Sequence, residues 1–350
     1  MIASQRTISE YSKCLRNLLT GLADESIHTA IVCPPRGEIA SIVPPSIEII
    51  QHPAFELPLC GYYNRNLLVE RLEKLNINVL HCLCESKAGF VRWLSRQLAI
   101  PYVLTVNSMR SKYFRLSISP RRCASILTPA ETIADSVASS RKKFADRIEQ
   151  INFGIFTEKT SNCFGHINRL AGIVIASPID DVADFENLFG ALKHLAIDGH
   201  EFMIVLIGSG RAEKKLWHLL NKLGLLRMVT FVPRPHSTEA VLKAGDIFIR
   251  PKPSKVFNPL LLEAMSVGAA VASCTGGVDD LIIDEQTAVT FDPTDEISIY
   301  DCLKRLFDNR NEARKIAKNG QKHLKKNHSV SAMVSATLQN YQDARQWFKS

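Results

Sequence analysis

Asn258, Pro259 and Glu263 lie where a strand-like run passes into a helix-like run, in the stretch KVFNPLLLEAM at 255–265. Asn258 is typical of a helix cap and Pro259 of a first helical residue, which places Leu260 in the first turn. The start of a helix offers N–H groups and a positive dipole end to a phosphate. Glu263 lies a turn and a half further on, where a carboxylate can accept hydrogen bonds from sugar hydroxyls. The stretch therefore predicts a site for a phosphate and a sugar.

A second turn follows the next strand-like run. Gly276 and Gly277 would let the backbone approach the same anion, although a tight strand-to-helix turn explains two glycines equally well. Asp279 and Asp280 come next and suit either a sugar hydroxyl or the first turn of a helix. His200 and His236 are interpreted as loop histidines.

Short β-branched runs alternate with helical patterns along the whole chain. Strands are predicted at 29–33, 77–83, 102–107, 124–129 and 148–154, and again at 172–177, 202–208, 228–233, 246–251, 269–274 and 288–293. An amphipathic helix is predicted at 89–98. This alternation is typical of parallel sheets with crossover helices, and ligands in such sheets bind at the carboxyl ends of the strands.

Length and composition limit the classes of protein. The 350 residues suit two cores, and 46% hydrophobic with 22% charged residues is a globular composition. The N-terminus lacks the layout of a secretory signal, which favours a cytoplasmic location. The nine cysteines indicate buried thiols rather than disulfides. Metal binding at Cys82 and Cys84 is poorly supported, because no second pair of ligands accompanies them. No metal is expected.

The net charge is +8, and most of the excess lies in residues 1–165. Such a surplus favours peripheral contact with an anionic membrane, at the inner face, or simply a solvated basic surface. Nucleic acid is not expected as a partner, because the basic residues are dispersed and lack interleaved aromatics.

Residues 251–288, PKPSKVFNPLLLEAMSVGAAVASCTGGVDDLIIDEQTA, resemble the signature of the retaining glycosyltransferases of family 4, which have the GT-B fold. The similarity continues upstream through 204–235 and 241–251 and covers roughly 160 residues. It implies two Rossmann-like, doubly wound α/β domains facing a cleft. We expect an acceptor-side domain at 1–165 and a nucleotide-sugar-binding domain at 166–329, with a last helix at about 330–350 that packs back on the first.

Residues 6–32 resemble the first helix and second strand of the family's N-terminal domain. The family's opening strand and glycine-rich loop, which normally precede that helix, are expected to be absent here. The resemblance implies that Glu263 holds the ribose of the donor.

Other site positions differ from the family pattern. Lys255 stands where a glutamate contacts the donor sugar, and Asn107 stands where a histidine helps to position it. Ser177 occupies the place of an arginine that neutralises the diphosphate, and Val182 or Ala183 the place of a lysine. The resemblance thus implies a degenerate active site.

One compensation for the lost cations is conceivable. Arg250, Lys252 and Lys255 precede the helix at Asn258 and could replace the missing charges on the diphosphate. The alternative is that Lys255 is a solvated loop lysine.

Two functions follow from the resemblance. One is sugar transfer, with retention, from a UDP- or GDP-linked donor to a glycan or lipid-linked acceptor, without a cofactor. The other is that of an inactive relative serving as a nucleotide-binding or scaffolding subunit. A dehydrogenase is less well supported, because GSG at 208–210 is too short for a dinucleotide fingerprint.

Overall fold

The computed structural model describes residues 1–35, 38–52, 61–109, 116–165, 169–232 and 238–349. The chain forms two compact α/β units, as the alternating pattern predicts. The first unit comprises Met1–Ile155 and His328–Ser350, and the second comprises Phe156–Asn327. The chain thus passes between units after Ile155, rather than after residue 165, and residues 156–165 pack with the second unit.

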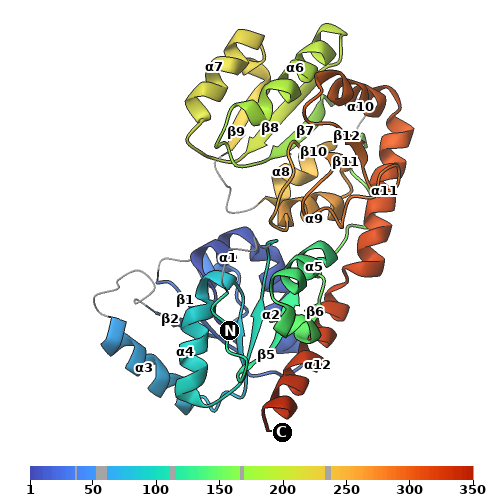
Figure 1. The fold of residues 1–350 in the computed structure, drawn as a ribbon. Helices are drawn as coiled ribbons and strands as arrows, with labels where there is room; N and C mark the ends of the chain where they lie inside the picture. Colours follow the sequence, from blue (N-terminus) through green and yellow to red (C-terminus); the bar gives the residue numbers. More distant parts are fainter. Residues whose placement is uncertain (36–37, 53–60, 110–115, 166–168, 233–237, 350) are drawn as a thin grey trace. The chain divides into compact units, whose positions relative to one another are not determined.

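The first unit is built on parallel strands (Figure 1). They are β1 (Ala30–Cys33), β2 (Glu48–Gln51), β3 (Leu80–Cys82), β4 (Tyr102–Thr105), β5 (Cys123–Thr128) and β6 (Ile148–Gln150), paired as β1-β2 and as β3-β4-β5-β6. The predicted strands are present. Strand β2 was not predicted; it is only four residues long and follows two prolines.

The first residues of the chain join the two sets of strands. Ile2 forms parallel bridges with Val32 of β1 and Cys82 of β3. The N–H of Ile2 donates to the carbonyl of His81 at 2.8 Å, and its carbonyl accepts from the N–H of Leu83 at 2.9 Å. Ile2 therefore links β1 and β3 through isolated bridges, while no strand is assigned before α1 among the described residues.

Helices surround this sheet: α1 (Gln5–Glu10), α2 (Ser12–Asp24), α3 (Gly61–Lys74), α4 (Ala88–Leu98), α5 (Glu131–Ser140) and α12 (Val330–Lys349), with short 3-10 turns at Glu38–Ser41, Glu85–Lys87 and Lys142–Arg147. The helix predicted at 89–98 is α4. The C-terminal helix α12 packs in this unit, against α2 and β5 (Figure 1). Leu18 and Leu22 of α2 share a core cluster with Met333 and Val334 of α12.

The second unit has one six-stranded parallel sheet in the order β12-β11-β10-β7-β8-β9. Its strands are β7 (Ala171–Ala176), β8 (Phe202–Ile207), β9 (Val229–Val232), β10 (Ile247–Arg250), β11 (Ala270–Cys274) and β12 (Val289–Phe291). The first and fourth strands of the unit, β7 and β10, are neighbours, and strand order reverses there. In a doubly wound sheet this switch point is where ligands bind, beyond the carboxyl ends of the strands.

The helices of the second unit are α6 (Ala183–Ile197), α7 (Glu213–Leu223), α8 (Glu239–Ala244), α9 (Pro259–Ser266), α10 (Glu296–Asp308) and α11 (Arg310–Asn327), with a 3-10 turn at Leu226–Met228. The strands supply a buried apolar core, and Phe185, Phe189, Leu303 and Ile316 cover it from the helices. Burial on both faces explains why these strands appear as nearly continuous apolar runs in the sequence.

Among the described residues, no helix is long and apolar enough to cross a membrane.

Candidate functional site

The helix predicted to begin at Asn258 is α9, which starts beyond the carboxyl end of β10. Asn258 has an extended backbone, and its Oδ1 accepts from the N–H groups of Leu260 at 3.1 Å and Leu261 at 3.2 Å. Pro259 is the first helical residue and has no N–H to donate. The capping prediction is correct, but the cap itself uses the first two N–H groups. What α9 still offers an anion is chiefly its positive dipole end.

Glu263 lies in α9 and is 4% exposed. Its Oε2 accepts from the hydroxyl of Thr238, just before α8, at 2.7 Å. A carboxylate has about four acceptor sites, so Glu263 can accept further hydrogen bonds while it holds Thr238. The buried carboxylate thus lies in α9, the helix that follows β10, with Thr238 as a hydrogen-bond partner.

Arg250 is not available to a diphosphate. It ends β10, is 2% exposed, and all three of its nitrogens donate within the unit. Nε contacts Ser273 Oγ at 2.8 Å, Nη1 the carbonyl of Val278 at 2.9 Å, and Nη2 the carbonyl of Cys274 at 2.5 Å. Burial lowers the pKa of the guanidinium from its ordinary value. Arg250 therefore ties β10 to the loop after β11.

Lys252 is also engaged, because its ammonium pairs with the carboxylate of Asp184 in the first turn of α6. Both side chains are about 30% exposed. Asp184 thus neutralises one of the lysines expected to compensate for lost cations.

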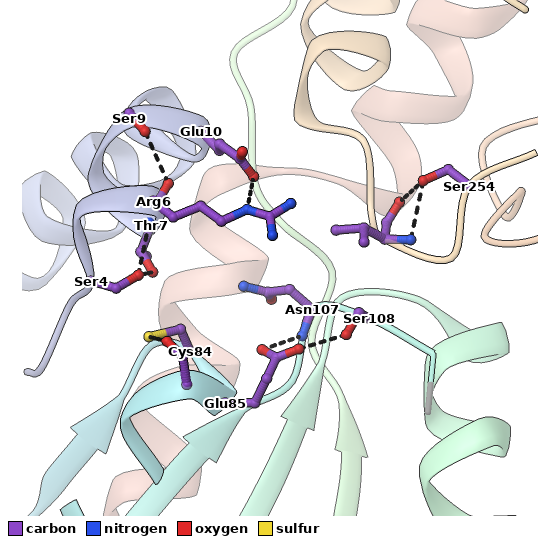
Figure 2. Close-up of polar contacts among 12 residues, drawn as sticks. Ser4, Arg6, Thr7, Ser9, Glu10, Cys84, Glu85, Asn107, Ser108 and Ser254 are labelled. Atoms are coloured by element: carbon purple, nitrogen blue, oxygen red, sulfur yellow. Dashed lines mark hydrogen bonds and ion pairs between the residues drawn. The ribbon is translucent and has the colours of Figure 1, made fainter. Parts of the chain in front are cut away.

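Lys255 is the exposed member of the expected trio. No hydrogen bond or ion pair holds its ammonium among the described residues. Next to it, Ser254 Oγ donates to the carbonyl of Val256 at 2.8 Å and accepts from the N–H of Val256 at 3.1 Å, which fixes the turn (Figure 2). The expected cationic trio is therefore corrected to one available ammonium, that of Lys255.

Gly276 and Gly277 form a turn that packs on this loop. Both have positive φ, of 98° and 79°. A Cβ on Gly277 would lie 2.0 Å from the carbonyl oxygen of Ser254, and the N–H of Gly276 donates to Asp279 Oδ2 at 2.9 Å. The glycines thus allow two loops of the unit to approach each other. Asp279 caps the turn, and Asp280 is half-buried beside it.

The loop after β7 carries the positions at which the resemblance implies cations. Ser177 is buried, and its hydroxyl donates to the carbonyl of Pro178 at 3.4 Å. Val182 precedes the first residue of α6, Ala183, whose N–H donates to Asp181. None of these side chains carries a positive charge.

Sequence reasoning missed Arg211, in the loop after β8. Its Nε donates to the carbonyl of Asp180 at 3.1 Å, and the side chain is exposed. The two loops are held together, because the N–H of Ile179 donates to the carbonyl of Ser209. Arg211 therefore brings a cation against the loop after β7. The sequence signal that could have indicated Arg211 is its position directly after Gly208 and Gly210, in the loop that follows β8.

In the first unit, Asn107 follows β4 and is 6% exposed. Its Nδ2 donates to the carbonyl of Leu83 and its N–H to Glu85 Oε2, both at 3.4 Å, while Ser108 Oγ donates to Glu85 Oε1 at 2.6 Å (Figure 2). Asn107 Oδ1 has no hydrogen-bond partner among the described residues. It lines a small cavity of about 40 Å³ with Thr105 and Thr128.

Other candidate residues have ordinary contacts. Cys82 donates to the carbonyl of Cys84 at 3.0 Å, and both are buried thiols. His200 lies 3.5 Å from Asp308, and His236 lies outside the described residues. Within the described part of the chain, no group of three His, Cys, Asp or Glu side chains is placed to hold a metal.

Residues 172–323, which include the whole α9 region, match the family model of the glycosyl transferases group 1. The matched residues lie within the second unit. The sulfoquinovosyl transferase SQD2 of Arabidopsis thaliana is 28% identical over 152 residues, which are 42% of this chain and 29% of that protein. A glycogen synthase of Mycobacterium tuberculosis is 26% identical over 145 residues, 41% of this chain and 35% of that protein. The match therefore spans about a third of these relatives.

Solved structures resemble the chain over nearly its full length. A glycosyltransferase from Rickettsia africae has a TM-score of 0.76 at 14% identity, covering 98% of this chain and 97% of that one. Anabaena Alr3699/HepE in complex with UDP-glucose has a TM-score of 0.76 at 13% identity, with 97% and 98% covered. At this identity the likeness establishes the fold. The GT-B expectation is confirmed, and the residues that match the group 1 model lie in the second α/β unit.

Proposed function

We propose that this chain binds a nucleotide-sugar donor in its group 1 domain and transfers the sugar, with retention, to an acceptor. The observation that carries the proposal is Glu263, a buried carboxylate one turn inside a capped helix at the β7/β10 switch point. Its place suits hydrogen bonds from ribose hydroxyls. The UDP and UDP-glucose bound in the structures of Anabaena Alr3699/HepE favour a UDP-linked donor over a GDP-linked one.

The diphosphate needs positive charge, since its leaving-group charge grows during transfer. Among the described residues at this edge, Lys255 and Arg211 have charged groups that face no carboxylate partner. Together with the α9 dipole they replace the family's arginine and lysine. Lys255 is then a phosphate ligand.

The acceptor is proposed to be a glycan or a lipid-linked sugar held by the first unit. The basic surplus of residues 1–165 suits an acceptor that bears acidic groups or lies at an anionic membrane surface.

Donor hydrolysis tests the proposal. The full chain is incubated without acceptor with UDP-glucose, UDP-galactose, UDP-N-acetylglucosamine and GDP-mannose, and released nucleotide is measured. Release from at least one donor, abolished by boiling and reduced in Glu263→Gln, is expected. If no donor releases nucleotide although binding is retained, the proposed enzymatic activity is wrong. The second candidate function, described next, would then remain.

That second candidate is a nucleotide-binding subunit without turnover. The observations that favour it are the burial of Arg250 and the pairing of Lys252 with Asp184, which leave few cations for the leaving group.

A further inference from the structure

A cationic groove lies elsewhere in the second unit, between α11 and the segment 159–165. Its volume is about 480 Å³. The lining side chains are Lys159, Thr160, Ser161, Cys163, Arg314, Lys318, Gln321, Lys322 and Lys325, with Gly165. Among the described residues, no lining side chain is acidic and none is aromatic. A volume of this size suits a small ligand.

Hydrogen bonds hold the walls of the groove in place. Gln321, only 5% exposed, donates from Nε2 to the carbonyl of Glu158 at 3.3 Å and to that of Ser266 at 3.2 Å. Ser161 Oγ donates to the carbonyl of Gly268 at 2.6 Å, and Arg314 Nη2 to that of Phe164 at 2.7 Å. These bonds fix the segment against α11 and the C-terminal end of α9, so the walls are preformed.

The positive charge of α11 is not balanced by acidic residues of the same helix. Its 18 residues contain one acid, Glu312, and that carboxylate pairs with Arg305 of α10. Lys159, Lys318, Lys322 and Lys325 are exposed, and no ion pair holds any of them among the described residues. Lys318 and Lys322 stand four residues apart, a spacing at which like charges destabilise a helix. An anion in the groove would remove this repulsion.

We propose that the groove binds a soluble oligoanion that bears phosphate groups in series. Lys318 and Lys325 are seven residues apart, about 10 Å along the helix, which exceeds the reach of one phosphate. Lysine ammoniums with the hydroxyl of Thr160 are suitable phosphate donors.

Two other occupants fit less well. A membrane surface is flat, and interfacial binding uses apolar side chains that this lining lacks. Single-stranded nucleic acid needs aromatic platforms, which are also absent from it.

The groove is distinct from the donor site. It adjoins Ser266 and Gly268 at the C-terminal end of α9, while the donor is proposed to bind at the N-terminal end, about 12 Å away along the helix.

Calorimetric titration of tripolyphosphate into the full chain tests the proposal. The titration is run with saturating UDP and without it, so that occupancy of the donor site is separated from the groove. Lys318→Ala/Lys322→Ala is compared with Lys315→Ala/Lys326→Ala, which removes the same charge from exposed positions of α11 outside the groove. We expect the groove pair to weaken binding by about tenfold or more, and the control pair to leave it nearly unchanged.

Thermal unfolding at low salt provides a second readout. Tripolyphosphate should raise the Tm of the parent and of the control pair, but not that of the groove pair, which should be as stable as the parent without ligand because alanine favours helix.

Three results would overturn the proposal. The first is that tripolyphosphate binds no more tightly than inorganic phosphate, and the second is that the two pairs of substitutions lose equal affinity for tripolyphosphate. The third is groove-dependent binding to phosphatidylglycerol vesicles without binding of tripolyphosphate. The last would assign the surface to a membrane.

Discussion

At the scale of single residues, the structure separates the cations that resemble one another in sequence. Arg250, Lys252 and Lys255 are close in the chain, but only Lys255 has an ammonium that is exposed and unengaged by the described residues. Direction and partner, not spacing, decide which cation can meet a ligand. Lys255 is therefore expected to contribute to nucleotide binding.

Lys255→Ala should weaken the binding of UDP by about tenfold, because a charge-assisted hydrogen bond to a phosphate is lost. Lys222→Ala is the matched control, since Lys222 is exposed in the last turn of α7, at the opposite edge of the sheet. Calorimetric titration of UDP into both variants measures the two affinities. Unchanged affinity in Lys255→Ala would make it an ordinary solvated loop lysine.

His81 predicts a pH dependence of stability in the first unit. Burial, and to a smaller extent the nearby N-terminal charge, lower its pKa to about 3. Its Nδ1 contacts the hydroxyl of Tyr341 at 2.6 Å and its Nε2 that of Thr105 at 2.7 Å. The unfolded chain takes up a proton at His81 near pH 6.5, while the folded chain does not until about pH 3.

Stability from neutral His81 is therefore present above pH 6.5 and is lost as the pH falls. Between pH 7.5 and 5.5 the free energy of unfolding should decrease by about 1.4 kcal/mol from this residue. Denaturant titrations at both pH values measure it, and His81→Gln should show a smaller decrease. An equal decrease in the variant would assign the effect to other groups.

At the scale of elements, the strands and the start of α9 were predictable because each has a local cause. Apolar runs mark buried strands, and Asn258 with Pro259 marks a helix start. The segment at Ile2 and the strand β2 were not predictable, since pairing through two bridges or four residues leaves little pattern. The partners of Arg250 and Lys252 depend on residues distant in the chain, so the site could be predicted only in part.

The Gly276–Gly277 turn yields a prediction about packing between loops. Gly277→Ala should destabilise the second unit by about 2 to 4 kcal/mol, because a Cβ would meet the carbonyl of Ser254 at 2.0 Å in addition to the cost of a positive φ. Gly224 also has a positive φ, of 75°, but an added Cβ there would meet no atom within 4 Å. Gly224→Ala should therefore lower the free energy of unfolding by only about 1 kcal/mol. Denaturant unfolding compares them, and equal costs would show that the loop contact is unimportant.

At the scale of the whole molecule, the last helix belongs to the first unit although it follows the second in sequence. Met333 and Val334 complete a cluster with Leu18 and Leu22, and a Cβ on Gly21 would meet Val334 at 2.3 Å. The sequence indicated this arrangement only through a last helical segment that follows no strand, because no local pattern tells which unit an amphipathic helix will cover.

A chain that stops after residue 329 should lose the cooperative folding of the first unit, because α2 and β5 lose their apolar cover. The second unit has its own core and should still unfold cooperatively. Hydrogen exchange followed by mass spectrometry resolves the two units. Protection of the β3–β5 amides equal to that of the full chain would contradict the assignment.

The central claim is that a nucleoside diphosphate binds at the switch point of the second unit, with Glu263 holding its ribose. Calorimetric titration of UDP into the full chain and into Glu263→Gln tests it most directly, with the Tm of each confirming the fold. We predict saturable binding that weakens by about tenfold in the variant. Absence of binding to the parent, or equal affinity in the two proteins, would contradict the claim.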